Sequence, residues 1–196
     1  MITDKKTYKA YVKQDLLAYD IHRLSWYRYL SDERLRFQLR LRKVEYLYNT
    51  SRKNPLKKLA YFLLQVINHR LAIKLGFTIP MNVFGPGLCI THWGTIVVST
   101  YAKVGKNCRI HPSTCIGNHG GAPILGDNVY IGPGAKIFGN IMIGNNVAVG
   151  ANAVVNKSFP DNVTIAGSPA RIISQKSSLE VGVYSPDFLE HIRNEQ

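Results

Sequence analysis

The sequence contains few cysteines and no long apolar run, and each shortage excludes a class of protein. The three cysteines among its 196 residues, Cys89, Cys108 and Cys115, lack the C-x-x-C spacing of zinc or redox sites. We therefore expect reduced cysteines in apolar surroundings, in a cytoplasmic protein. No stretch of eighteen apolar residues occurs, so no membrane-spanning helix is expected.

Acidic residues are also scarce, with 12 Asp and Glu against 25 Lys and Arg and a net charge of +13. Residues 1–80 carry 17 basic and 6 acidic side chains, or +11, whereas residues 81–196 carry 8 and 6, or +2. A basic surface attracts anionic membranes, nucleic acids or charged substrates, although a merely solvated basic face is equally compatible. No nucleic-acid-reading motif accompanies the charge, so nucleic acid is not the expected partner. Peripheral contact of the basic region with a membrane stays open.

The first part of the chain has helix-like periodicity. Residues 35–48 alternate in places like a strand but also suit an amphipathic helix. A clearer helix is predicted between Asn54, a candidate cap followed by Pro55, and Gly76, a usual C-terminal stop. Its apolar residues recur at three and four, which predicts one buried face, in the core or at an oligomer contact, with membrane docking as a lesser alternative. These residues are Leu56, Leu59, Phe62, Leu63, Val66, Ile67 and Leu71.

From Phe84 onward, aliphatic or Phe anchors recur with a different period. They are Phe84, Ile90, Ile96, Val104, Ile110, Ile116, Leu125, Ile131, Ile137, Ile143, Val149 and Val155. The last six are spaced by six without exception, which fits neither a helix at 3.6 nor a simple strand at two. A triangular coil of three short strands, with anchors on its axis and Gly or Asn at its corners, explains the spacing. Twelve anchors predict four coils.

Two breaks interrupt the six-residue register. Eight residues separate Ile96 from Val104, and nine separate Ile116 from Leu125. Each break predicts a short excursion at a corner, where functional residues are often found.

The repeats resemble those of the hexapeptide-repeat acyltransferases, and most closely the catalytic domain of serine acetyltransferase. The matching features are FGPGLCITHWGTIVV, the loop IGNHGGAPILGDN, the run IGPGAKIFGNIMIGNNVAVGANAVV and the ending IAGSPARII. This resemblance implies a mainly β protein, a left-handed parallel β-helix of about four coils with an α-helical N-terminal region. The expected divisions are a basic helical region at 1–77, the β-helix at 78–173 and a C-terminal tail at 174–196.

An ionisable side chain interrupts the apolar stretch LCITHWGTIVV at His92. A neutral imidazole can accept the proton of a hydroxyl that attacks a thioester carbonyl, and the resemblance gives His92 this role of general base. It also implies acetyl-CoA as co-substrate, no metal, and a homotrimer or dimer of trimers with sites between subunits. The implied coenzyme A contacts are Asn118, Pro133, Ala151, Gly167 and Arg171. Further candidates for substrate contact or catalytic support are Thr91, Trp93 and His119.

The chain departs from serine acetyltransferases at acidic and basic positions. Thr91 stands where an aspartate precedes the base, Phe77 where a second aspartate orients it, and Gly121–Ala122 where an Arg-His pair occurs. Because the ammonium of free serine needs a carboxylate partner, we expect an acceptor hydroxyl on a sugar of a surface polysaccharide or its lipid-linked precursor. The precursor and the basic region suggest the inner face of the membrane.

Three other functions stay under consideration. One is the serine O-acetyltransferase of cysteine synthesis, and another is a non-catalytic binding or scaffold solenoid. A metal-dependent hydratase of the carbonic anhydrase type would use His92, His111 and His119, which lack the close late pair of that class.

Overall fold

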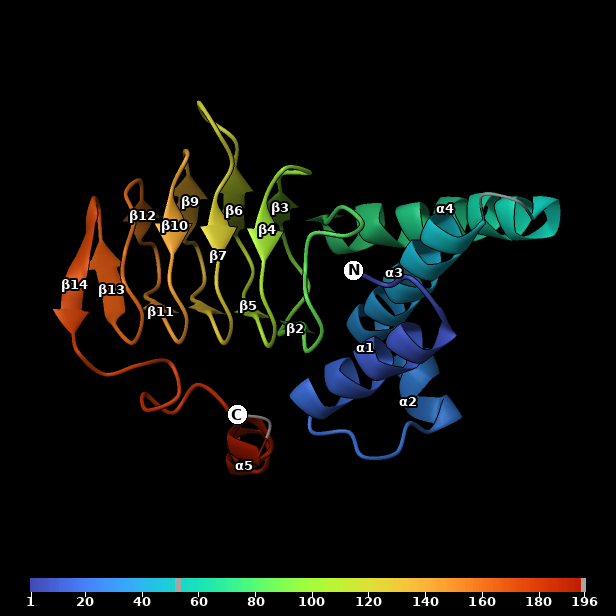
Figure 1. Cartoon of the computed structure of the whole chain (residues 1–196), viewed down its shortest axis with the longest axis horizontal. Coiled ribbons are helices and arrows are strands. Elements are labelled where there is room, and N and C mark those ends of the chain that lie inside the picture. Colours follow the sequence, from blue (N-terminus) through green and yellow to red (C-terminus); the bar gives the residue numbers. More distant parts are fainter. Residues whose placement is uncertain (52–53, 195–196) are drawn as a thin grey trace.

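A computed structural model describes residues 1–51 and 54–194 of the chain. A parallel β-solenoid forms one part of the molecule, and four helices lie at the end where the solenoid begins (Figure 1). No helix within the described ranges is both long enough and apolar enough to cross a membrane.

The described residues form five helices, and one of them, α4, has ends that the sequence predicts. They are α1 (Lys5–Ala18), α2 (Trp26–Ser31), α3 (Glu33–Thr50), α4 (Pro55–Leu75) and α5 (Pro186–Asn194). The Asn54 side chain accepts from the Lys57 N–H at 3.1 Å, and Gly76 ends α4 in the left-handed conformation, φ 79°. Both predicted ends of α4 are confirmed. Residues 35–48 are helical, within α3.

In the described part of the chain, fourteen short strands form three sheets. They are β1 (Phe77–Thr78), β2 (Cys89–Ile90), β3 (Ile96–Val98), β4 (Lys103–Val104), β5 (Arg109–Ile110), β6 (Thr114–Gly117), β7 (Ile124–Leu125), β8 (Tyr130–Ile131), β9 (Lys136–Phe138), β10 (Met142–Ile143), β11 (Ala148–Val149), β12 (Val154–Val155), β13 (Thr164–Gly167) and β14 (Ala170–Ser174). One sheet has the order β1-β3-β6-β9-β12, the second β10-β7-β4, and the third β14-β13-β11-β8-β5-β2. All pairs are parallel except β13 with β14.

The solenoid has about five turns, one more than predicted. The additional inward side chains are Phe77 and Ile79 at the start and Phe159 and Ile165 at the end, all buried. Phe159 follows Val155 by four residues, so it falls outside the six-residue spacing. The hexad count therefore missed part of the last turn.

The first register break was placed at the wrong corner. Ile96 pairs with Thr114 and Val98 with Ile116, while Ile90 pairs with Ile110. Val98 is therefore the axial partner of the next coil's anchor. Its spacing of six to the following anchor is regular, and the two extra residues lie between β2 and β3. The second break, between β6 and β7, is where it was predicted; Figure 1 shows it as the tall yellow loop.

Asparagines line one corner of the solenoid in the left-handed conformation. Asn107, Asn128, Asn146 and Asn162 have φ between 56° and 60°. Each amide donates to the next along this row, at 2.7–2.8 Å. The Gln14 side chain of α1 donates to Asn107 Oδ1 at 3.1 Å and so continues the row into the helical region. Asparagine suits this corner because it tolerates positive φ and its short amide side chain reaches the asparagine of the next coil.

Within one chain the apolar face of α4 is exposed, so the prediction that it lies in the core is wrong, while the oligomer contact and the membrane contact stay predictions. Leu71 alone of the predicted residues is buried, because α3 and β1 pack against the other side of the helix. The exposed fractions are 76% for Leu56, 56% for Leu59, 61% for Phe62, 54% for Leu63, 38% for Val66 and 49% for Ile67.

The C-terminal segment returns to the helical region. Tyr184, Phe188 and Ile192 pack with Ala18 of α1 and with Cys89 of β2. The tail therefore leaves β14 at one end of the solenoid, runs back past the middle coils, and attaches α5 at the other end, beside α1 (Figure 1).

Candidate active site

His92 lies at the corner between β2 and β3 that contains the two extra residues. Its side chain is exposed, so it points away from the solenoid axis. Its ring lies 6.5 Å, between centroids, from the ring of His111 in the next coil, at 51°. Residues 1–51 and 54–194 form no hydrogen bond to the His92 imidazole, so its nitrogens are accessible to a bound molecule.

The backbone just before His92 is held from both sides. Thr91 is buried; its N–H and its hydroxyl both donate to the carbonyl of Ile110, at 3.1 and 3.2 Å. Its own carbonyl accepts from the guanidinium of Arg34, which also forms an ion pair of 2.9 Å with Asp32. Thr91 therefore positions the corner through these contacts, and its hydroxyl is not directed to solvent.

Side chains from the helices cap the unpaired edge of β2, the first strand of its sheet. Asp15 accepts from the Leu88 N–H at 3.0 Å, and Gln38 donates to the Leu88 carbonyl at 2.6 Å. The Tyr19 hydroxyl accepts from the Ile90 N–H at 3.0 Å. These bonds replace those that a preceding coil would make, and they fix the strand that leads to His92.

His111 lies beside His92, and the sequence did not predict this proximity. It is half-buried, its Nε2 has no hydrogen-bond partner in the described part of the chain, and its ring packs edge-on against Tyr130 at 5.1 Å. Burial, with the charges of Arg109 and His92, lowers the pKa of His111 to about 4. His111 is therefore a neutral imidazole at pH 7. Only the coil register places it beside His92.

Three of the candidate coenzyme contacts lie in line with His92. The anchors Ile90, Ile110, Ile131, Val149 and Ile165 pair in register down one sheet. The residue two positions after an anchor is exposed in four of these coils. These residues are, in order, His92, Pro133, Ala151 and Gly167. Since paired strands are about 4.8 Å apart, four steps separate His92 from Gly167 by about 19 Å. Arg171, also exposed, pairs across β14 with the residue before Gly167.

Asn118 and His119 belong to a different corner. They lie in the loop after β6, where the Asn118 side chain accepts from the Gly121 N–H at 3.2 Å. The length of β6, roughly 13 Å at about 3.3 Å per residue, separates this corner from that of His92. Within one chain, therefore, the two candidate groups do not meet.

Trp93 borders a polar recess beside His92. Its side chain is 69% exposed and faces a recess of about 520 Å³ formed with α2 and the start of α3. Arg28 and the Asp32–Arg34 ion pair contribute charged groups to this recess. Glu33 also lines it and forms ion pairs with Arg36 and Lys74. An aromatic surface and several polar groups thus gather at Trp93, the residue that follows His92, while His92 itself does not line the recess.

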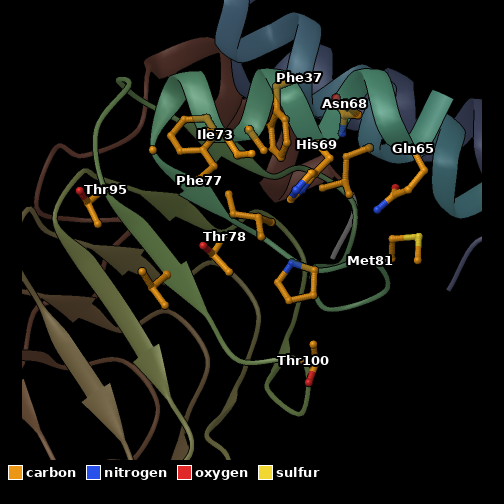
Figure 2. Close-up of a pocket in the computed structure, with 16 residues that line it drawn as sticks. Phe37, Gln65, Asn68, His69, Ile73, Phe77, Thr78, Met81, Thr95 and Thr100 are labelled. Carbon is orange, nitrogen blue, oxygen red and sulfur yellow. The ribbon is translucent and has the colours of Figure 1, made fainter. Parts of the chain in front are cut away.

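A separate cavity lies between the helices and the first strands of the solenoid. It measures about 620 Å³ and is formed by α4, β1 and β3, with Phe37 and Phe77 among its apolar walls (Figure 2). The buried Asn68 Oδ1 has no partner among the described residues. Thr95 reaches the cavity, whereas His92 does not line it. This cavity is therefore separate from the candidate active site.

The described ranges contain no group of three or more His, Cys, Asp or Glu side chains able to hold a metal ion. His119 lies at a different corner from the His92–His111 pair, so the three histidines of the hydratase hypothesis are not brought together within one chain.

Known proteins match both the sequence and the fold. Residues 122–157 match the family described as bacterial transferase hexapeptide (six repeats). The chain is 36% identical over 115 residues to the serine acetyltransferase of Synechococcus elongatus, covering 56% of this chain and 47% of that protein. It is 36% identical over 125 residues to that of Staphylococcus xylosus, covering 61% and 58%. The chain thus spans about half the length of these relatives.

The fold is shared over a greater length with a solved structure. The crystal structure of Neisseria gonorrhoeae serine acetyltransferase matches with a TM-score of 0.69 and 30% identity, covering 91% of this chain and 69% of that one. The chain therefore belongs to the hexapeptide-repeat acyltransferases, whose fold is a left-handed β-helix, and is similar to the serine acetyltransferases among them.

Proposed function

We propose that this protein is an acetyl-CoA-dependent O-acetyltransferase with His92 as its general base. The observation that supports this most strongly is the exposed imidazole at a corner fixed by Thr91 and the helices. His92 would remove the proton of the acceptor hydroxyl as its oxygen attacks the thioester carbonyl. The tetrahedral intermediate would then expel the coenzyme thiolate, which takes the proton back from the imidazolium.

The thioester arm would lie along the line of exposed residues below His92. Small side chains at Pro133, Ala151 and Gly167 leave the backbone accessible to an extended chain over about 19 Å. Arg171 lies at the far end of this line and would bind a phosphate group.

A trimer would complete the site. The Asn118–His119 loop projects from another corner, so it can reach the His92 corner only of a neighbouring subunit. Family membership supports this homotrimer, or a dimer of trimers. A mixture of two inactive variants, one lacking His92 and one lacking the His119 side chain, should regain activity if hybrid trimers form.

The acceptor would be a sugar hydroxyl of a surface polysaccharide or its precursor. The recess at Trp93 supports a sugar, since an exposed indole offers a flat apolar face beside hydroxyl-binding polar groups. Arg28 adds a cation that suits a phosphorylated precursor. Such an acceptor would place the enzyme in the cytoplasm at the inner face of the membrane, in peripheral contact through its basic region.

Free serine is the second candidate acceptor, favoured by the serine acetyltransferase relatives. Against it, neither of the two positions where serine acetyltransferases have an aspartate carries a charge here: one is the buried Phe77 and the other is Thr91. The nearby carboxylates of Asp32 and Glu33 are already paired with cations. A serine ammonium would therefore have to displace an existing ion pair.

A thiol-release assay with acetyl-CoA tests these proposals. Turnover is expected with sugars or oligosaccharides, with less on serine; preferential turnover of serine would reverse the choice of acceptor. His92→Ala should lower kcat by at least about 100-fold, as expected for a lost general base. His22→Ala, at an exposed histidine between α1 and α2, serves as the control. Unchanged turnover in His92→Ala, or no thiol release with any acceptor, would refute the assignment.

A further inference from the structure

The outer face of α4 carries a second pattern of residues, opposite to the side that packs on α3. Its members are spaced alternately by three and four over residues 56–73, which is the seven-residue repeat of a coiled coil. All six members of this outer seam are exposed in a single chain. They are Leu56, Leu59, Leu63, Val66, Arg70 and Ile73. Such a seam is typical of a helix that packs along another helix.

The residue types of the outer seam favour three copies over two. Leu56 and Leu63 occupy the first position of the repeat. Two of the three residues at the second position, Val66 and Ile73, are β-branched. Leucine at the first position with isoleucine at the second shifts coiled coils from dimers toward trimers and tetramers.

The outer seam lies on the same side of the molecule as the proposed contact between subunits. The sheet β1-β3-β6-β9-β12 lies between the His92 corner and the Asn118–His119 loop, so joining these two corners in a trimer turns three copies of this sheet toward a common axis. Ile73 of the seam and Val97 of this sheet line the same cavity (Figure 2). Through Gly76, α4 is continuous with β1, and it extends beyond the first coil in the direction in which the coils stack (Figure 1).

We propose that the α4 helices of three subunits form a parallel coiled coil around this axis, with the outer seam at its centre. The helices are parallel because each one continues into the same sheet of its own subunit. This inference rests on the trimer of the proposed function, and it adds the helical region to the contact between subunits. The apolar face that a single chain exposes is then covered by two other copies of the same face.

Arg70 is the seam residue that opposes this packing. Three guanidinium groups near one axis repel each other, but a single basic residue at the first position of a repeat is tolerated at a cost in stability and fixes the register of the helices. The long stem of arginine lets the charge reach solvent while its methylene groups stay in the seam. Replacement of Arg70 with leucine should therefore strengthen the contact between subunits.

Chemical cross-linking of the full chain tests the proposal. In a Cys115→Ser parent, the remaining natural thiols, Cys89 and Cys108, are buried. Leu63→Cys on this parent should react with a short bismaleimide to give covalent dimers, because neighbouring helix axes in a bundle are about 8–10 Å apart and seam residues face each other. Since each linker joins two thiols, no more than two of the three chains in a trimer should become cross-linked. The matched control is Lys58→Cys, exposed on the flank of the same helix, which should stay monomeric on a denaturing gel.

Light scattering at decreasing subunit concentration measures the strength of the trimer. Arg70→Leu should lower the concentration at which the trimer dissociates. Leu59→Gln with Leu63→Gln should raise that concentration about tenfold or more, since buried apolar area is lost. The control is Trp26→Gln with Tyr27→Gln, two exposed residues of α2 on the opposite side of the helical region from α4, which should leave it unchanged (Figure 1).

The outcomes separate this inference from the proposed function. A trimer in which Leu63→Cys cross-links no faster than Lys58→Cys would overturn the coiled coil and leave the proposed trimer standing. A trimer weakened by Arg70→Leu, or unchanged by the paired glutamines, would also overturn the coiled coil. A monomeric unchanged protein would overturn both the coiled coil and the trimer. Cross-linking of Leu63→Cys without thiol release from acetyl-CoA would support the coiled coil and refute the proposed activity.

Discussion

Replacement of Asp15 tests whether the helical region is bonded to the solenoid as the structure indicates. Asp15 and Arg42 are fully buried and bond through two pairs of atoms, at 2.8 and 3.2 Å. Arg42 also donates to Glu45 at 3.1 Å and to the Phe84 carbonyl at 2.9 Å. Burial lowers the pKa of Arg42, but the two carboxylates outweigh it and raise the pKa above its usual value, so the guanidinium stays charged.

Asp15→Asn keeps the size of the side chain and an oxygen that can accept from the Leu88 N–H. It removes one of the two charges that compensate Arg42. Loss of a buried partner typically costs 3–5 kcal/mol, and since Glu45 remains, we expect the free energy of unfolding to fall by about 3 kcal/mol. Lys74→Gln, which breaks an exposed ion pair with Glu33, should cost less than about 1 kcal/mol.

Urea unfolding at one fixed subunit concentration measures both variants, because subunit association adds to apparent stability. Hydrogen exchange gives a local readout, in which the amides of residues 84–91 should exchange faster in Asp15→Asn. A loss below about 1 kcal/mol, or unchanged exchange in this segment, would refute the view that the buried ion pair attaches the helices to the first coil.

Two further predictions concern the solenoid itself. The folded-state pKa of His111 is about 4, below its unfolded value, so the unfolded chain binds the extra proton as pH falls from about 6.5 to 4. The free energy of unfolding should therefore fall over that range by about 1–2 kcal/mol after allowance for partial exposure, and it should fall less in His111→Phe. Urea unfolding at the two pH values measures this, and an equal fall in the unchanged protein and in His111→Phe would contradict the prediction. Asn128→Ala removes two hydrogen bonds of the asparagine row at a residue with positive φ, and it should lower the free energy of unfolding by about 2 kcal/mol. Asn128→Gly should cost less, because glycine adopts positive φ without strain. A melting temperature unchanged by Asn128→Ala would contradict the role of the row.

The solenoid was predictable because its core is periodic along the chain. Each anchor is buried against the anchors one coil away, so burial recurs every six residues and can be read locally. The position of the extra corner residues was not predictable by the same rule. Ile96 and Val98 both point inward on one strand, so either could be the anchor, and only pairing with Thr114 and Ile116 decides between them.

Contacts distant in sequence account for the rest of what was missed. Asp15 and Tyr19 bond to residues more than 70 positions away, and neither carries a local signal for this role. The exposure of α4 has a different origin. Periodicity identifies an apolar face, but it does not say whether the covering partner is the same chain or another surface.

The caps on β2 connect the basic region to the chemistry at His92. A solenoid that began at β2 would present unpaired N–H and C=O groups at its first edge, which invites association with other strands. Asp15, Tyr19 and Gln38 supply these partners, and Arg34 bonds the residue before the imidazole. The helices therefore both close the solenoid and fix the corner of His92. Because α3 packs on α4 and also contacts β2, the packing of α4 is connected to that corner through α3.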